Sequence, residues 1–284
     1  MPITYTKMHG LGNDYLFIET AKNSIDDPVE LSRQMSHRHL GAGSDGIILI
    51  MPGEGSADFK MRIFNADGSE AETCGNGIRC FAKYVYERGL TEKTEFIIDT
   101  LGGPNGVVLT IEDGIVGFVR SNMGAPKFER AEIPMIGAEG RVLEEDIEVD
   151  GKIFQVTCAN IGNPHAVVFV DGATGDELLD LAQTIGPKIE NHPSFPERCN
   201  VEFVNVIDRD NIVMRIWERG SGITMASGSG SCGAALACMI TERVNRKVKV
   251  HLVYGQLAIE WSEEDGDVYQ EGPATEVYTG EWLT

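Results

Sequence analysis

Cys74-Gly75-Asn76-Gly77 and Ser227-Gly228-Ser229-Gly230 are two similar motifs that lie 153 residues apart (227 minus 74). Each runs into a helix-like segment, from about Gly77 to Arg88 in the first case and from about Ser231 to Val244 in the second. Each motif would therefore place a Cys or Ser side chain and several unpaired backbone N–H groups at the N-terminus of a helix. Two copies of one arrangement predict two half-sites that face each other.

Short β-rich runs surround each expected helix. They cover residues 15–18, 46–51, 60–64, 95–100, 107–111 and 115–120 in the first half, and 154–157, 166–170, 201–206, 212–217, 247–253 and 257–261 in the second. The order predicts an α/β (α+β) protein with two similar halves. We expect the boundary near Arg120–Gly124, a surface excursion of the second half over Gly124–Glu148, and a last strand over Glu276–Trp282 that could close either half.

Length and charge limit the classes of protein that fit. A chain of 284 residues with 42% hydrophobic content can form two cores of about 140 residues each. Its 24 Lys and Arg against 44 Asp and Glu give a formal charge of −20, which repels nucleic acid and anionic membrane surfaces. The sequence begins without an apolar signal core and contains no hydrophobic run long enough to span a bilayer. We expect a soluble, unprocessed protein with neither nucleic acid nor membrane as a partner.

The cysteines are too sparse for a disulfide scaffold, and none forms a CxxC pair. They fit reduced thiols in the cytoplasm. Cys74 is the catalytic candidate because it lies between a polar stretch and a Gly-x-Gly helix start, where a thiol is reactive. The other five are interpreted as structural: Cys80, Cys158, Cys199, Cys232 and Cys238.

The two helix starts indicate a specific chemistry. A helix N-terminus binds a carboxylate, and it stabilises the charge that moves onto an α-carboxylate when the α-proton of an amino acid leaves. A thiol, with an ordinary pKa of about 8.5, can act as the acid or the base in that step. The alternative that the Gly-Ser run holds the phosphate of pyridoxal phosphate or of a flavin lacks a supporting lysine or nucleotide motif. We expect neither a cofactor nor a metal.

Several ordered motifs resemble diaminopimelate epimerase from the first residues to Gly272-Pro273-Ala274. They are Met8-His9-Gly10-Leu11-Gly12-Asn13-Asp14-Tyr15, Phe64-Asn65-Ala66-Asp67-Gly68-Ser69-Glu70, Cys74-Gly75-Asn76-Gly77-Ile78-Arg79-Cys80, Gly162-Asn163-Pro164-His165-Ala166, Asn200-Val201-Glu202-Phe203 and Trp217-Glu218-Arg219-Gly220. The family implies a cofactor-independent epimerase that interconverts LL- and meso-diaminopimelate for lysine and peptidoglycan synthesis. It implies two pseudo-symmetric domains, each a strand-rich sheet wrapped around a central helix.

The resemblance also implies domains and partners. Residues 1–120 with about 271–284 would form the half that carries Cys74, and residues 121–270 the half that carries Glu218 and Ser227, with the active site in the cleft between them. The substrate is a small amino acid. A homodimer is compatible with the family, although the sequence does not report the oligomeric state.

The family's functional positions carry over residue by residue. Cys74 matches one catalytic cysteine, Ser227 stands at the position of the other, and His165 and Glu218 match groups that assist proton transfer. The substrate-contacting positions are Asn13, Asn65, Asn163, Asn200, Glu218 and Arg219, and the helix-start positions that hold the α-carboxylate are Gly75, Asn76, Gly228 and Ser229. Amides, one guanidinium and one carboxylate suit the distal zwitterion of diaminopimelate.

Two positions depart from the family. Ser227 replaces a cysteine, and Ile223 replaces the usual glutamate. A serine hydroxyl is a poor partner for proton transfer at pH 7, and Cys232 is a poor substitute because five residues along a helix place it about 7.5 Å further and roughly 140° around. Impaired epimerisation is the consequence. Three explanations stay open. Ser227 could be an introduced Cys→Ser change. It could be natural in a relative that is a slower epimerase, a racemase of another amino acid or a one-base eliminase. Or the chain could be a non-catalytic paralogue that binds an amino acid.

Overall fold

The computed structural model describes residues 2–283, which divide into two compact units. Unit 1 contains residues up to Asn122 together with those from Glu271 onward, and unit 2 contains Met123–Gln270. β8 (Ile115–Gly124) and β17 (Val268–Gly272) are the strands along which the chain passes from one unit to the other. None of the helices between residues 2 and 283 is long and apolar enough to cross a membrane.

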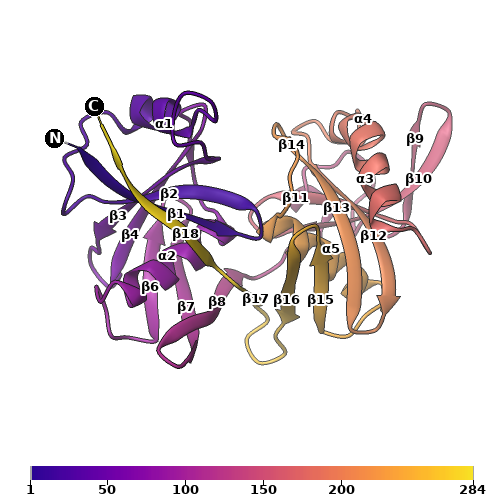
Figure 1. Ribbon diagram of the computed structural model, residues 1–284. Coiled ribbons are helices and arrows are strands. Elements are labelled where there is room, and N and C mark those ends of the chain that lie inside the picture. Colours follow the sequence, from indigo (N-terminus) through magenta and orange to yellow (C-terminus); the bar gives the residue numbers. More distant parts are fainter. Residues whose placement is uncertain (1, 284) are drawn as a thin grey trace. The chain divides into compact units, whose positions relative to one another are not determined.

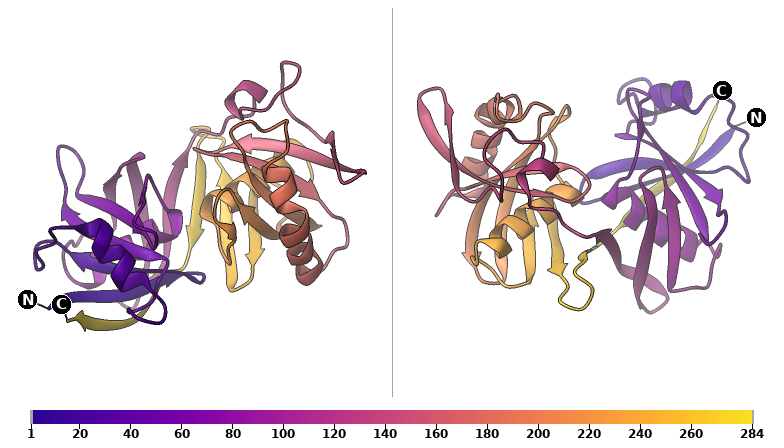
Figure 2. Two further views of the ribbon diagram at one scale, coloured as in Figure 1. Left: turned by 90° about the horizontal axis from the view of Figure 1, so that it is seen from above. Right: turned by 180° about the vertical axis from the view of Figure 1, so that it is seen from behind.

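Among its described residues, unit 1 contains two helices, α1 and α2, and its other regular elements are strands (Figure 1). Its elements besides β8 are β1 (Ile3–Gly10), β2 (Asn13–Glu19), α1 (Pro28–Ser36), β3 (Gly46–Pro52), β4 (Phe59–Asn65), β5 (Glu70–Ala71), α2 (Gly75–Glu87), β6 (Glu95–Thr100), β7 (Gly103–Glu112) and β18 (Thr275–Trp282). The first and last strands pair antiparallel, with Ile3 opposite Trp282, so both ends of the chain lie at the same side of this unit (Figures 1 and 2). The strand expected over 276–282 therefore belongs to unit 1.

The core of unit 1 is built on α2. Ile78, Phe81 and Val85 on this helix are fully buried against apolar side chains of the sheet strands, among them Phe17 and Ile48. Burying a large apolar side chain stabilises the fold by about 1.5–3 kcal/mol. A second, smaller cluster lies under α1. The fixed position of α2 in the core holds its N-terminus, and therefore Cys74, in place.

Unit 2 has its own sheet and its own long apolar helix, α5 (Gly228–Ile240). Its other elements besides β17 are η1 (Arg130–Glu132), β9 (Glu145–Val149), β10 (Lys152–Asn160), β11 (Pro164–Phe169), α3 (Gly175–Thr184), α4 (Gly186–Glu190), β12 (Asn200–Asp208), β13 (Asn211–Glu218), β14 (Gly222–Ile223), β15 (Lys247–Leu252) and β16 (Gly255–Trp261). Nearly every residue of α5 is buried, which fits a helix whose side chains are small and mostly apolar on all sides. α5 contacts strands of its sheet from β10 to β16, so the sheet surrounds it.

The two sheets have the same order of strand pairing. In unit 1, β1–β2 is antiparallel, β2–β3 parallel, β3–β4 antiparallel, β4–β6 parallel and β6–β7 antiparallel. In unit 2, β10–β11, β11–β12, β12–β13, β13–β15 and β15–β16 repeat that alternation. The helices α2 and α5 occupy the same place in the two series, since α2 lies between β4 and β6 in the chain and α5 lies between β13 and β15. The predicted α/β (α+β) fold of pseudo-symmetric domains, each wrapped around a central helix, is confirmed.

Two expectations about local structure need correction. The segment Gly124–Glu148 is not only a surface excursion, because Phe128, Ile133, Val142 and Ile147 within it are buried. Its polar and glycine-rich composition hid these separated apolar positions. Both long helices also begin earlier than expected, directly after Cys74 and Ser227. These two side chains cap the helices, so the glycines after them are already helical.

Candidate functional site

Cys74 is the N-cap residue of α2. Its backbone is extended (φ −151°, ψ 109°), and its Sγ accepts a hydrogen bond from the Gly77 N–H at 3.4 Å. The side chain is half-buried, unlike those of the other five cysteines. Backbone N–H groups of the first helical turn and the helix dipole favour negative charge at this position. Cys74 therefore combines accessibility with an electropositive setting, which a reactive thiol requires.

Two asparagines lie directly beside Cys74. The Cys74 thiol donates to Asn13 Oδ1 at 3.5 Å, and Asn76 Nδ2 donates to the same oxygen at 3.1 Å. Asn76 Oδ1 in turn accepts from Arg79 Nη2 at 2.6 Å, and the Arg79 guanidinium, which is fully buried, also donates to the Pro273 carbonyl. The amide of Asn76 is therefore fixed by a buried cation, with its NH2 group toward Asn13.

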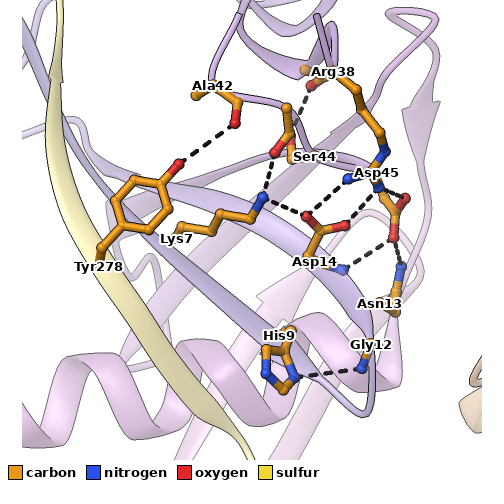
Figure 3. A network of polar contacts seen from close by, with 12 residues as sticks. Lys7, His9, Gly12, Asn13, Asp14, Arg38, Ala42, Ser44, Asp45 and Tyr278 are labelled. Atoms are coloured by element: carbon orange, nitrogen blue, oxygen red, sulfur yellow. Dashed lines mark hydrogen bonds and ion pairs between the residues drawn. The ribbon is translucent and has the colours of Figure 1, made fainter. Parts of the chain in front are cut away.

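A network of carboxylates and cations supports Asn13 from behind (Figure 3). Asn13 Nδ2 donates to Asp45 Oδ2 at 2.7 Å, which leaves the Asn13 carbonyl facing Cys74. Arg38 bridges Asp45 and Asp14, and Lys7 pairs with Asp14 at 2.8 Å. Burial alone would raise the pKa of Asp14, but the hydrogen bonds from Arg38 and Lys7 lower it. Burial, followed by the charge of Asp14, raises the pKa of Asp45.

Tyr15 is a neighbour of Cys74 that the sequence reasoning missed. Its side chain is buried, and the pKa of its hydroxyl is raised well above the usual value by burial and then by Cys74. The hydroxyl also interacts with Asn13. Its place in the short apolar run Tyr15–Ile18 marks Tyr15 only as a core residue, so no sequence signal distinguishes it from an ordinary buried aromatic.

Asn65 ends β4 and forms a turn with Ser69. Its side-chain Nδ2 donates to Ser69 Oγ at 3.0 Å. Its backbone is placed next to Asp45, because Gly46 pairs with Asn65 and the Ala66 N–H donates to the Asp45 carbonyl at 2.9 Å. Asn65 thus lies beside the network that holds Asn13, through its backbone rather than through its amide.

Ser227 is the N-cap residue of α5 and repeats the geometry of Cys74. Its backbone is extended (φ −128°, ψ 122°), and its Oγ accepts from the Gly230 N–H at 3.2 Å. Its side chain is buried, and the Gln270 side chain lies against Gly228 in the first turn. Ser229 Oγ accepts a hydrogen bond from Asn163 Nδ2 at 3.4 Å. The first turn of α5 is therefore lined by polar groups of unit 2.

His165 and Glu202, which are buried, and Asn163, which is half-buried, form a chain of hydrogen bonds near the start of α5. His165 Nδ1 lies 2.7 Å from Glu202 Oε1, and His165 Nε2 lies 2.8 Å from Asn163 Oδ1. Burial raises the pKa of Glu202, while the charge and the hydrogen bond of His165 lower it, with a net rise. The sequence motifs identified His165 and Asn163, but they gave no role to Glu202.

Glu218 is the last residue of β13, and Arg219 lies in the turn that follows. The Arg219 N–H donates to Asn200 Oδ1 at 2.9 Å, and Asn200 Nδ2 donates to the Pro164 carbonyl at 3.1 Å. Arg219 Nη1 donates to the Glu197 carbonyl at 3.2 Å. Asn200 therefore joins the turn that carries Arg219 to the start of β11, next to His165.

The remaining cysteines are all buried. Burial raises the pKa of Cys80 and of Cys238 to about 12, and it raises the pKa values of Cys158 and Cys199 as well. Cys232 lies within α5, near the Gln270 amide at 3.8 Å. Between residues 2 and 283, no group of three or more His, Cys, Asp and Glu side chains has the arrangement of a metal site.

The structure thus groups the predicted residues into two sets. In unit 1, Asn13, Gly75 and Asn76 gather around Cys74, with Asn65 beside the supporting network. In unit 2, the start of α5 (Ser227, Gly228, Ser229) is in contact with Asn163 and through it with His165, and Asn200 contacts Arg219. Each set combines a helix N-terminus, which can bind a carboxylate, with side-chain amides, which can bind both ends of a zwitterion.

Comparison with known proteins gives consistent results over the whole chain. The family model for diaminopimelate epimerase matches residues 5–129 and 157–277. A diaminopimelate epimerase of Moorella thermoacetica is 50% identical over 279 residues, which are 98% of each chain. One of Acetivibrio thermocellus is 47% identical over 277 residues, covering 98% of this chain and 97% of the relative. A solved hydroxyproline epimerase of Agrobacterium vitis, with bound trans-4-hydroxy-L-proline, has a TM-score of 0.69 at 16% identity, covering 99% and 92% of the two chains, and shows the shared fold.

Proposed function

Because the chain belongs to the diaminopimelate epimerase family, as its motifs predicted, we propose that it interconverts LL- and meso-2,6-diaminopimelate without a cofactor. The reaction removes the α-hydrogen from one face of one α-carbon and adds a proton on the opposite face. The observation that carries the proposal is the pair of matching N-cap positions, Cys74 at α2 and Ser227 at α5, in two units with the same strand order. Names of relatives support an epimerase. The substrate, the two-base mechanism and the effect of Ser227 belong to the proposal.

In this proposal, backbone N–H groups at the helix starts that Cys74 and Ser227 cap are the binding groups for the substrate α-carboxylate. The positive ends of the helix dipoles then stabilise the negative charge that develops when the α-proton leaves. Cys74 exchanges that proton on one face of the α-carbon. The half-buried position of its sulfur and its place at the helix N-terminus support this role.

The second end of diaminopimelate is also a zwitterion and needs its own binding groups. Arg219 supplies a guanidinium that can bind the distal carboxylate in a bidentate manner. Glu218 supplies a negative charge for the distal ammonium, and the amides of Asn65, Asn163 and Asn200 supply further donors and acceptors. The backbone link from Arg219 to Asn200 supports a common role for these two residues.

Ser227 limits the second half of the reaction. A two-base epimerase needs one group that removes the proton and another that returns it on the opposite face. The Ser227 hydroxyl occupies the same N-cap position at α5 that the Cys74 thiol occupies at α2, and each accepts a hydrogen bond from the backbone N–H three residues later. It is a much weaker acid, so proton transfer on its face is slow at pH 7. We therefore propose impaired epimerisation with retained binding and retained hydrogen exchange by Cys74.

Ser227 also favours a second candidate function. If the hydroxyl serves only as a helix cap, the chain is an amino-acid-binding paralogue, or it catalyses racemisation or elimination on a related amino acid with Cys74 as the single base. The binding paralogue predicts stabilisation by diaminopimelate without any exchange of its α-hydrogen. The six free thiols fit a reducing compartment, which supports a cytoplasmic location for either function.

Proton NMR of LL- and meso-diaminopimelate in deuterated water separates these functions. The chain would be compared with Ser227→Cys, and Cys74→Ser would serve as the matched control. We expect the Ser227→Cys variant to interconvert the isomers, the unchanged chain to exchange the α-hydrogen with little interconversion, and Cys74→Ser to do neither. Binding without exchange by both the chain and Ser227→Cys would identify the paralogue, and absence of binding by either would remove diaminopimelate as the substrate.

A further inference from the structure

Glu202 and His165 form a hydrogen-bonded pair that is buried from solvent. Both side chains are 0% exposed. β11 and β12 pair in parallel, with His165 opposite Asn200 and Val167 opposite Glu202, which places the two side chains on the same face of the sheet. α5 covers that face so closely that a Cβ on Gly233 would lie 2.5 Å from His165 Cγ. The imidazole is thus fixed between a strand, a carboxyl group and a helix.

Burial decides how many protons the pair holds. A buried carboxylate beside a neutral imidazole would be a net negative charge in a low-dielectric site, and such a charge is costly without full pairing. Only one oxygen of Glu202 is paired, since Oε2 has no hydrogen-bond partner among the described residues. The neighbouring Glu218 adds negative charge and disfavours a further one. A proton on Glu202 Oε2 would have no acceptor. The pair therefore holds one proton between Glu202 Oε1 and His165 Nδ1, as imidazolium with carboxylate or as neutral imidazole with carboxylic acid.

Both protonation forms of the Glu202–His165 pair place a hydrogen on the other ring nitrogen of His165, Nε2. In the charged form, both imidazole nitrogens carry hydrogen. In the neutral form, the Glu202 hydroxyl donates to Nδ1, so the ring hydrogen is on Nε2. His165 Nε2 is a donor in either case, and the atom that it faces at 2.8 Å must be the carbonyl oxygen of Asn163. The NH2 group of Asn163 then points to Ser229, in the first turn of α5.

We propose that Glu202 is a positioning residue that keeps a hydrogen on His165 Nε2 and thereby holds Asn163 with its NH2 group toward the N-terminus of α5. The orientation adds a side-chain donor to the backbone donors of that turn, which suits a substrate carboxylate and opposes a cationic group. With hydrogen on Nε2, His165 assists proton transfer as a hydrogen-bond donor or as an acid. The link to substrate binding rests on the function proposed above.

Nitrogen NMR of the histidine side chains tests the proton assignment without substrate. The protein would be labelled with 15N-histidine, and the His165 signals would be assigned as those missing in His165→Gln. We expect Nε2 to carry hydrogen from pH 6 to pH 8.5. The other titratable groups that face Glu202 are Glu218, Cys158 and Cys199, and burial raises the pKa of both thiols above their usual value. An Nε2 without hydrogen would mean that the Asn163 amide is reversed, and it would overturn the proposal.

Two substitutions of Glu202 test the link to Asn163. Glu202→Gln retains a donor for Nδ1, so Nε2 should keep its hydrogen and diaminopimelate affinity should change by less than about threefold. Glu202→Met has similar volume but no polar group, so Nε2 should lose its hydrogen in part and affinity should fall about tenfold, as expected when one hydrogen bond to a charged group is lost. Val149→Ala, a core truncation of the same unit, controls for loss of stability.

The outcomes separate the two proposals. Equal effects of the Gln and Met substitutions on Nε2 and on affinity, or an equal loss of affinity in Val149→Ala, would reduce Glu202 to a structural residue. If Glu202→Met does not fold, the Nε2 signal of the unchanged chain and of Glu202→Gln still decides the proton assignment. A protonated Nε2 in a chain that does not bind diaminopimelate would leave the role of Glu202 intact and would refute the proposed substrate instead.

Discussion

Gly233→Ala should destabilise the protein although alanine is the better helix former. An alanine in place of glycine in a helix interior normally raises the free energy of unfolding by about 1 kcal/mol. Here the added Cβ would lie 2.5, 2.7 and 3.0 Å from three atoms of the His165 side chain, against ordinary contacts of 3.4–4 Å. The imidazole would have to move by about 1 Å, and overpacking of this kind costs about 1–3 kcal/mol. After the gain of about 1 kcal/mol from alanine is subtracted, we expect a net decrease in the free energy of unfolding of up to about 2 kcal/mol.

A double-mutant cycle isolates the contact. In a His165→Ala background the imidazole is absent, so Gly233→Ala should become neutral or stabilising by up to about 1 kcal/mol. The assay is urea denaturation followed by tryptophan fluorescence, since Trp217 and Trp261 both report on unit 2. A stabilising Gly233→Ala in the unchanged chain, or the same effect in both backgrounds, would show that His165 does not lie against α5 at this position.

Three further results are expected. Iodoacetamide at pH 8 should label Cys74 much faster than Cys80 and Cys238, because these two are buried with pKa values of about 12; equal labelling, measured by peptide mass spectrometry, would remove Cys74 as the reactive thiol. The pKa of Asp14 is lowered, so its ionised form stabilises the fold above the unfolded-state pKa of about 3.9, and this stabilisation is lost as pH falls through the folded-state pKa. The difference in unfolding free energy between the chain and Asp14→Asn should therefore shrink in acid. A difference that stays constant with pH would contradict the ion pairs of Asp14. Arg219→Met should weaken diaminopimelate binding in calorimetry by about 10- to 100-fold, as for loss of a charge-assisted hydrogen bond, with unchanged circular dichroism; unchanged affinity would remove Arg219 from the site.

The repeat of helix start and strands was predictable from the sequence. The expected strands at 46–51, 60–64 and 95–100 match β3, β4 and β6. The first is an uninterrupted apolar run, and in the other two charged residues stand among the apolar ones, as in a strand with one buried face. α1 and α3 were missed. They are short, with 9 and 10 residues, and have few buried apolar positions, such as Leu31 and Met35 in α1, so each offers fewer than three turns from which a helix can be recognised.

The candidate site was predictable where a residue belongs to a motif. Cys74, Asn13 and Asn76 were expected together, and the structure brings them into hydrogen-bond contact. Asp45 and Glu202, which fix the amides of Asn13 and, through His165, of Asn163, were not expected. Both act through long-range strand pairing rather than through a local pattern: β3 brings Asp45 to Asn13, and β12 brings Glu202 to His165. From the sequence alone, a carboxylate in or next to a strand is expected to face solvent, because its partner on the neighbouring strand is unknown.

Hydrogen exchange at the α-carbon of diaminopimelate in deuterated water, compared between the chain and its Ser227→Cys variant, tests the proposed epimerase chemistry most directly. The proposal predicts wash-out of the α-hydrogen with little change of isomer for the chain, and rapid interconversion of the LL and meso isomers when residue 227 is cysteine. A Ser227→Cys variant that binds diaminopimelate but leaves its α-hydrogen in place would contradict the proposal, because both N-cap thiols would then be present without proton transfer.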